Sequence, residues 1–228
     1  MVVYSDFRTG GVRRVDVESV TLRSSQGAND SVTTFTATVT NVGGRNSTTF
    51  AIGDEVTIFA DLDITSPVTR LFTGILNDIQ YKGQGQQEKI TLQGRDYSGR
   101  MIDTTVEPVT YTNQTAEFIV RDIIDSYPEM GVTRNNVQNS GTTLNKLVIR
   151  HKSVYDTIKQ VAEFVDFIFY VDDNRDLHFE PKNSISSGVT LNNTNVIHAD
   201  FRSTDREISN RIWVYGGSQR LAIQDTFA

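Results

Sequence analysis

The 228-residue sequence contains no cysteine. Disulfide bonds and thiolate metal sites are therefore excluded, and stability must come from apolar burial and strand pairing. The sequence also has no apolar run near the roughly 18 residues that span a bilayer. No apolar run of signal-peptide length follows Met1. These absences permit folding in a reducing cytoplasm. They predict neither membrane insertion nor secretion through an N-terminal signal.

Positive charge is also scarce, since 22 Lys and Arg residues stand against 28 Asp and Glu residues, for a net charge of −6. A nucleic-acid-binding domain normally carries a basic patch that neutralises phosphates, so no specific nucleic-acid partner is predicted. Adjacent basic residues occur at Arg13-Arg14 and in the run Arg150-His151-Lys152. We interpret both groups as solvated or interface charges, and Arg13 and Arg14 are candidate interface residues.

Signatures of catalysis are missing too. No Gly-x-Ser-x-Gly elbow is present, and no histidine has a partner at the i, i+4 spacing of a helical metal site. The histidines lie far apart in the sequence, at His151, His178 and His198. Two carboxylate pairs could in principle serve glycoside chemistry, Asp61/Asp63 and Asp122/Asp125. Nothing in the sequence distinguishes them from ordinary acidic residues on a solvated loop or helix face.

One segment partly matches a calcium-binding loop. Asp172, Asn174 and Asp176 have the spacing that opens an EF-hand, but Leu177 stands where glycine is needed and Asn183 where a bidentate glutamate is needed. A hairpin turn is the preferred interpretation. The Gly-x-Gly of residues 83–85 has no strand-to-helix context and is also interpreted as a turn. We therefore predict no catalytic, cofactor-binding or metal-binding residues, no cofactor, and no enzymatic activity.

What the sequence does contain is strand-like alternation from about residue 13 to residue 94. Valines and a leucine at 15, 17, 20 and 22 predict one long first strand with a bulge at the phase break. Phe35, Ala37 and Val39 alternate with threonines, as in a half-buried strand. Further strands are predicted over 56–60, 71–76 and 88–96, and the polar stretch 24–31 is expected to be an exposed contact loop. Gly74 within a strand indicates a bulge, a sharp corner or a close backbone approach, which favours closure into a small barrel.

The hydrophobic period then changes to that of helices. Apolar residues from Ala116 to Ile124 form a helical stripe, with Thr112 or Asn113 as the expected cap and an end before Pro128. A second helix is predicted to begin at Ser153, because Asp156 completes a motif like a capping box. A hairpin of short strands over 167–171 and 177–179 follows. These elements predict an α+β insert at residues 110–183.

Strand-like sequence resumes at Val189 and ends in residues 211–217, before a short tail. Trp213 and Tyr215 within it are candidate interface residues, since aromatic side chains favour interfaces. The predicted fold class is mainly β with an α+β insert: a first antiparallel barrel at residues 1–109, the insert at 110–183, and the start of a second, incomplete barrel at 184–228. The strands after Val189 are too few to close that second barrel.

The order of these segments resembles a known family, the hub proteins of phage baseplates and tails. This family includes the late control D proteins and is similar to the N-terminal half of type VI secretion spike proteins. The motifs that carry the resemblance extend from about residue 13 to residue 217: Ile52-Gly53-Asp54-Glu55-Val56, Phe72-Thr73-Gly74-Ile75-Leu76, Leu92-Gln93-Gly94-Arg95-Asp96-Tyr97, Ser153-Val154-Tyr155-Asp156-Thr157-Ile158, Tyr170-Val171-Asp172 before Leu177-His178-Phe179, and Asn210-Arg211-Ile212-Trp213-Val214-Tyr215-Gly216-Gly217.

The resemblance implies a fold and a function. In such hubs, two barrels like those of the tail tube flank an α/β insert, and three copies form a pseudo-hexameric ring. The ring connects the tail tube to the spike or tip of a contractile injection system. The implied partners are further copies in a homotrimer, the tail tube or distal tail protein, and the spike or tip protein. The implied location is the virion tail or baseplate, assembled in the cytoplasm of the bacterial host.

This chain departs from the family pattern where a full hub would continue past Gly217 to complete its second barrel. We expect either a fragment or compact variant, or a barrel completed by another polypeptide. The alternative function is a carbohydrate-binding or cell-wall-degrading phage tail protein. Its sequence support is weak, because no spare segment is long enough to hold a lysozyme or peptidase domain.

Overall fold

A computed structural model describes residues 3–24, 32–62, 69–83, 88–182, 184, 211–216 and 219–224. The chain divides into two compact units, Met1–Ser184 and Ile185–Ala228. The first unit contains a curled sheet and an α/β insert, each with its own hydrophobic core. In the second unit the structure describes a single hairpin.

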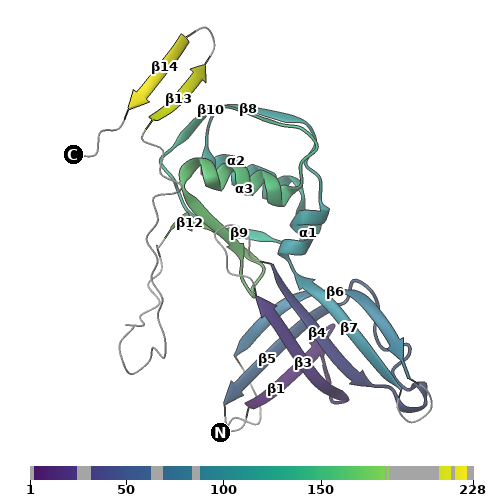
Figure 1. The fold of residues 1–228 in the computed structure, drawn as a ribbon. Helices are drawn as coiled ribbons and strands as arrows, with labels where there is room; N and C mark the ends of the chain where they lie inside the picture. The colour runs from purple at the N-terminus through teal and green to yellow at the C-terminus, as the bar shows by residue number, and fades with distance from the viewer. Residues whose placement is uncertain are drawn as a thin grey trace, which may run out of the picture. The chain divides into compact units, whose positions relative to one another are not determined.

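The curled sheet has seven antiparallel strands in the order β2-β1-β5-β6-β7-β4-β3 (Figure 1). Its strands are β1 Val3–Thr9, β2 Val12–Arg14, β3 Val17–Ser24, β4 Thr33–Thr40, β5 Glu55–Leu62, β6 Arg70–Lys82 and β7 Lys89–Asp96. The 3₁₀ helix η1, Val42–Gly44, lies between β4 and β5. The expected strands from residue 33 to residue 96 are therefore confirmed, while the loop expected at 24–31 lies almost wholly outside the described residues.

The sheet curls into a barrel around an aromatic core. Phe7 of β1 and Phe35 of β4 have three strands between them in the sheet order, yet their ring centroids are 6.0 Å apart. Phe35 also meets Phe72 of β6 edge to face at 5.3 Å. The barrel is nevertheless not closed by hydrogen bonds, because no pairing joins β2 to β3 within the described residues. A pocket of about 200 Å³ lined by residues of β1, β2 and β3 marks this seam.

The first strand of the barrel differs from the sequence prediction. The predicted long strand from residue 13 is two strands, β2 and β3, which lie at opposite ends of the sheet order because β2 pairs with β1 and β3 with β4. The expected bulge does occur, between Val17 and Ser19. Strand β1 was missed, although Gly10-Gly11 is a hairpin signal: both residues have positive φ, as a tight two-residue turn requires.

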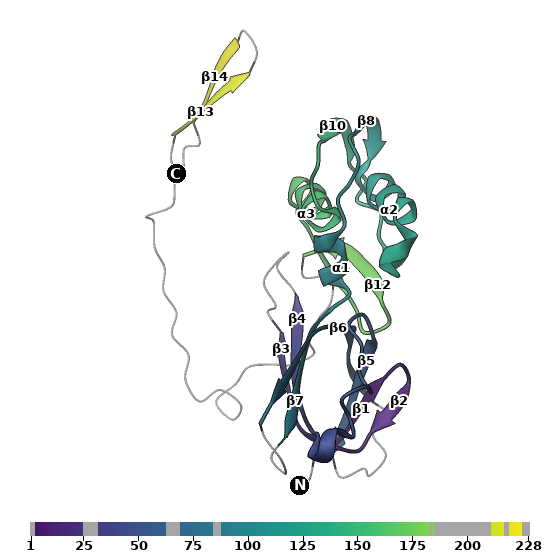
Figure 2. The same ribbon diagram turned by 90° about the vertical axis from the view of Figure 1, so that its right-hand side faces the viewer.

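The insert is built around two helices, α2 Ala116–Ser126 and α3 Val154–Val165 (Figure 2). The short helix α1, Ser98–Asp103, follows β7, and the 3₁₀ helix η3, Pro128–Met130, follows α2. The insert strands form a β10-β8 pair and a three-stranded sheet in the order β11-β12-β9, in which β12 and β9 are parallel. They are β8 Val109–Thr115, β9 Thr133–Val137, β10 Thr143–Ile149, β11 Phe167–Val171 and β12 Asp176–Pro181.

The two helices confirm most of the sequence prediction. Ser153 caps α3, since its hydroxyl accepts a hydrogen bond from the Asp156 amide at 2.9 Å. The cap predicted for α2 is wrong, because Thr115 caps this helix and both Thr112 and Asn113 belong to β8. Pairing between Thr115 and Thr143 keeps the chain extended as far as residue 115.

The second unit contains the hairpin of β13, Arg211–Gly216, and β14, Gln219–Gln224. The strand expected at 211–217 is confirmed. The expected short tail is corrected, since β14 lies within it. The rest of the segment from Val189 to residue 210 falls outside the described residues, so the start of a second barrel stays a prediction.

Candidate functional site

The insert meets the barrel through side chains of two segments that carry the family resemblance. Tyr97, which follows β7, donates a hydrogen bond from its hydroxyl to Glu55 Oε2 of β5 at 2.6 Å. Arg175 binds the same carboxylate oxygen at 3.1 Å, and its guanidinium lies 5.6 Å from the centre of the Tyr97 ring. Burial, followed by the hydrogen bond to Glu55, raises the pKa of Tyr97. These contacts hold the β11–β12 turn against the barrel.

Asp96 ties the start of the insert to a second barrel strand. Its carboxylate accepts hydrogen bonds from the Thr33 amide at 2.6 Å and from the Ser98 amide at 3.0 Å. Burial raises the pKa of Asp96 to about 6, against the effect of these hydrogen bonds. Strand β4 and helix α1 are thus joined through one partly buried carboxylate.

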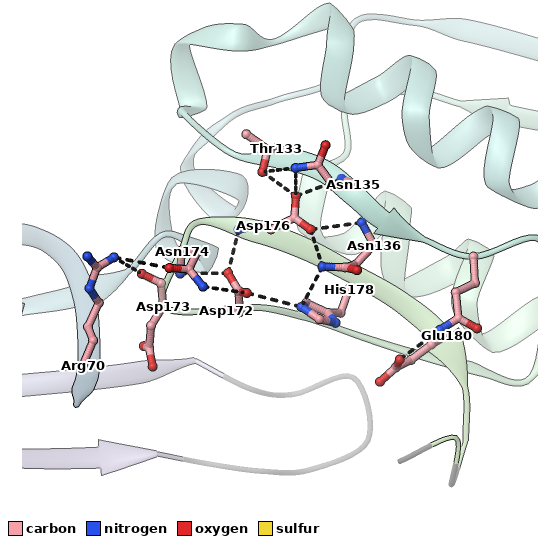
Figure 3. A network of polar contacts seen from close by, with 11 residues as sticks. Arg70, Thr133, Asn135, Asn136, Asp172, Asp173, Asn174, Asp176, His178 and Glu180 are labelled. Atoms are coloured by element: carbon pink, nitrogen blue, oxygen red, sulfur yellow. Dashed lines mark hydrogen bonds and ion pairs between the residues drawn. The ribbon is translucent and has the colours of Figure 1, made fainter. Parts of the chain in front are cut away.

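The β11–β12 turn also reaches the barrel through Arg70 of β6. Arg70 donates to the main-chain oxygen of Asp173 at 3.2 Å and to Asn174 Oδ1 at 3.4 Å (Figure 3). Burial and the neighbouring charge of Asp172 raise the pKa of Asp173. The turn itself is closed by Asp172 Oδ1, which accepts from the amides of Asn174 and Asp176, both at 2.8 Å. The interpretation of this segment as a hairpin turn is therefore confirmed.

Asp176 is the most heavily hydrogen-bonded carboxylate of the network in Figure 3. It is 5% exposed and accepts hydrogen bonds from the Thr133 hydroxyl and from the main-chain and side-chain nitrogens of Asn135 and Asn136. Burial acts to raise the pKa of Asp176, but these hydrogen bonds together lower it below its usual value. The carboxylate thereby fixes β9 beside β12.

Replacing Asp176 with asparagine is expected to reduce the free energy of unfolding by about 2 kcal/mol, because an amide NH₂ would face N–H donors that now have an acceptor. Urea denaturation at pH 7 measures the loss. Asp166→Asn is a matched control, since Asp166 is 80% exposed and its ion pair with Lys182 lies at the surface. Equal stability of the two variants would contradict the structural role of Asp176.

His178 has a carboxylate neighbour, Asp172, and an aromatic neighbour, Tyr170. Its ring stacks on Tyr170 with centroids 4.6 Å apart, and its Nε2 atom lies 3.4 Å from Asp172 Oδ2. Within the described part of the chain, no Ser or Thr hydroxyl is hydrogen-bonded to His178. Acyl-transfer chemistry needs such a hydroxyl beside the base. The structure gives His178 a packing and hydrogen-bonding role between β11, β12 and β9.

The other candidate groups are dispersed. Asp122 accepts from the Tyr111 hydroxyl, whereas Asp125 is paired with Arg134, so these two carboxylates face different partners. His151 is exposed, and both His198 and Asp63 lie outside the described residues. No cluster of His, Asp and Glu that could hold a metal ion occurs among the residues with described positions. Within the same residues, no helix is long and apolar enough to cross a membrane.

The two predicted interface arginines have different surroundings. Arg13 is 54% exposed and lies 3.4 Å from the buried carboxylate of Asp6. Arg14 is less exposed, because it donates to Thr9 at 2.7 Å and its guanidinium lies 5.6 Å from the centre of the Phe50 ring. Arg13 thus remains available to a partner, while Arg14 supports the barrel. Trp213 and Tyr215 lie on β13, and their contacts lie outside what the structure describes.

Sequence reasoning missed the residues that join the barrel to the insert. The segments holding Glu55, Asp96 and Tyr97 were singled out by resemblance alone, and Arg70 and Arg175 were given no role. Arg175 carried a usable signal, since an arginine within the turn Asp172–Asp176 is flanked by acids on both sides. Its partner Glu55 is 120 positions away, which no local pattern reveals.

Comparison with solved structures identifies proteins of the same architecture. A 43 kDa tail protein of prophage MuSo2 from Shewanella oneidensis matches with a TM-score of 0.66 and 16% identity, over 98% of this chain and 69% of that protein. A tail protein from Neisseria meningitidis MC58 matches with a TM-score of 0.67 and 13% identity, over 98% and 67% of the two chains. The chain has the fold of phage tail proteins.

A third structure with this tail-protein fold is prophage tail protein gp18 from Listeria monocytogenes EGD-e, with a TM-score of 0.61 and 12% identity over 97% of this chain and 67% of that one. No protein-family model and no curated protein sequence matches the chain. The resemblance proposed from the sequence is thus confirmed in the fold. The chain spans about two thirds of the length of these tail proteins.

Proposed function

We propose that the chain is a structural, non-catalytic subunit of a phage tail, located in the virion tail or baseplate. The observation that carries this proposal is the similarity of fold over almost the whole chain to three separate tail proteins. The surroundings of His178, Asp122 and Asp125 support the non-catalytic part. Within the described residues no Ser or Thr hydroxyl is hydrogen-bonded to His178, and the two carboxylates bind different partners, Tyr111 and Arg134.

The finer proposal is a hub that assembles as a trimeric, pseudo-hexameric ring between the tail tube and the spike or tip. The open ends of the barrel sheet support assembly, since β2 and β3 each present an edge without a hydrogen-bonded neighbour strand in the described residues. Edge strands with unpaired main-chain groups pair readily with other chains. Val15 between these edges is 84% exposed, as expected of a residue that a partner covers.

Mass measurement in solution tests the hub. The expected result is a trimer of about 77 kDa, three times the 25.5 kDa chain, with rings visible by electron microscopy and no release of sugars from peptidoglycan. A strict monomer that binds or cleaves peptidoglycan would overturn the proposal in favour of the carbohydrate-active alternative.

A pair of arginine variants sharpens the same test. Arg13→Ala is expected to weaken self-association by about tenfold, as loss of a contact residue at an interface does. Arg134→Ala is the matched control, because Arg134 lies on β9 of the insert, is 39% exposed and also has a single carboxylate partner, Asp125. Sedimentation equilibrium measures both variants. Equal weakening by the two would remove Arg13 from the proposed interface.

A further inference from the structure

The insert contains a pocket of about 450 Å³ that none of the roles above uses. It lies between the C-terminal half of α2 and the start of β8 with the residues just before it. The wall has an apolar part, which includes Val106, Pro108 and Val109, and a polar part that comes from two acids, two tyrosines and a serine. The volume is within the usual range of small-ligand sites.

Most hydrogen-bond donors at the pocket are already occupied. The Tyr111 hydroxyl donates to Asp122 Oδ2 at 2.7 Å, and the Ser126 hydroxyl donates to the main-chain oxygen of Asp122, also at 2.7 Å. The Glu107 amide donates to the Tyr127 hydroxyl oxygen at 2.7 Å. Among the hydroxyl groups that line the pocket, these bonds leave only the Tyr127 hydroxyl with a proton still free to donate.

The acceptors, in contrast, are available. Asp122 Oδ1 and both carboxylate oxygens of Glu107 have no hydrogen-bond partner among the described residues, and neither acid belongs to an ion pair there. No Lys, Arg or His lines the pocket. Arg121, next to Asp122 in sequence, donates instead to the main-chain oxygen of Val137 at 2.6 Å. The pocket wall therefore carries two carboxylates, the exposed Glu107 and the half-buried Asp122, without a basic partner among the described residues.

We infer that this pocket binds an ammonium or guanidinium group carried on an apolar stem. Such groups have only donors and a positive charge, which complements two free carboxylates. The tyrosine rings of the wall add cation–π attraction, and the apolar side chains suit the methylene stem. The ligand is either a free small molecule, such as an amino acid or polyamine, or an arginine or lysine side chain of a partner protein.

Matched blocked amino acids test the charge requirement on the full chain. N-acetyl-arginine amide is titrated to about 20 mM, since few contacts give at best millimolar affinity, and saturation-transfer NMR detects binding. N-acetyl-citrulline amide has nearly the same shape, but its ureido group is neutral and has a carbonyl oxygen in place of one donor nitrogen. Binding of arginine and not of citrulline is the expected result. No binding of arginine, equal binding of both, or binding of chito-oligosaccharide alone would overturn the inference.

Two variants on α2 locate the binding. Asp122→Asn is expected to weaken arginine binding at least about tenfold, the effect of losing one close charge pair. Asp125→Asn should leave it unchanged, because Asp125 is outside the pocket and paired with Arg134. An unchanged affinity of Asp122→Asn would contradict the site. Circular dichroism of both variants controls for folding.

The source of the cation is distinguished by two further ligands. Tighter binding of a Gly-Ser-flanked arginine peptide than of the blocked amino acid supports the site and identifies a protein side chain as its ligand. Tighter binding of spermidine than of the blocked amino acid supports the site and identifies a free polyamine as its ligand. The inference does not depend on trimer formation, so a trimer that fails to bind arginine would refute this inference and leave the proposed function standing.

Discussion

Replacing Gly94 with alanine is expected to destabilise the protein by about 4 kcal/mol, above the usual cost of overpacking. A Cβ atom at this position would lie 2.1 Å from the main-chain oxygen of Ile75 and 2.5 Å from Cε1 of Phe35. The carbonyl belongs to the paired strand β6, and Phe35 is fully buried in the barrel core. Neither group can move without breaking strand pairing or core packing.

Urea denaturation at pH 7 measures this loss, with Gln93→Ala as the control. Gln93 precedes Gly94 on β7, but its side chain is exposed on the opposite face. Its truncation should change the unfolding free energy by less than about 0.5 kcal/mol. A Gly94→Ala variant as stable as the Gln93→Ala control would show that β6 and β7 are not packed this closely.

The contribution of Asp96 to the free energy of unfolding is expected to decrease as the pH rises from about 4 to about 6. The folded-state pKa of Asp96 is raised from 3.8 to about 6, chiefly by burial. Between these two values the folded protein retains a proton that the unfolded chain releases, so the contribution of Asp96 is fully present below pH 3.8 and is lost as the pH rises through about 6. The shift corresponds to about 3 kcal/mol.

The Asp96→Asn variant isolates this contribution from other titrating groups. Unfolding free energies of both proteins are measured at several pH values between about 3.5 and about 7.5. The wild-type value minus the variant value should decrease by about 3 kcal/mol across the range, because asparagine does not titrate. A difference that stays constant, or that increases with pH, would show that burial does not control this carboxyl group.

Most of the first barrel could be predicted from period-2 alternation. Phe35, Ala37 and Val39 are buried as their alternation with threonine indicates, since side chains on a strand point alternately to the two faces. The separation of β2 from β3 could not be predicted in this way. Both segments are strand-like, and only their pairing with different neighbours divides them. Pairing is a long-range property that alternation does not contain.

The insert was predicted in part for a similar reason. The helices have strong local signals, the stripe of Ile119 and Ile123 and the cap at Ser153. Strands β8 and β9 were missed because their sequences are mostly polar, and β10 was missed because its buried residues, Leu144, Leu147 and Ile149, do not keep a strict period of two. Asparagine at 135 and 136 in β9 argues against a strand by propensity. Hydrogen bonds to Asp176 overcome that preference.

The candidate sites divide in the same way. Nothing in the sequence distinguishes Asp122 from a solvated acid on a helix face, because its partner Tyr111 lies on another element. The free carboxylates of Asp122 and Glu107 form a candidate binding site only because folding places both in the wall of one pocket. Arg13 was identifiable as a basic residue on a surface strand, but the structure alone separates it from Arg14, whose guanidinium lies beside Phe50.

The sequence by itself determined the absence of cysteine chemistry, the mainly β class with its two-helix insert, and the family that the motif order resembles. These properties depend on composition and on the spacing of residues close together in the chain. The tertiary structure alone decided the open seam of the barrel, the Glu55–Tyr97–Arg175 junction and the acidic pocket at α2. Each of these joins residues far apart in sequence, and their interaction depends on distances and burial that exist only after folding.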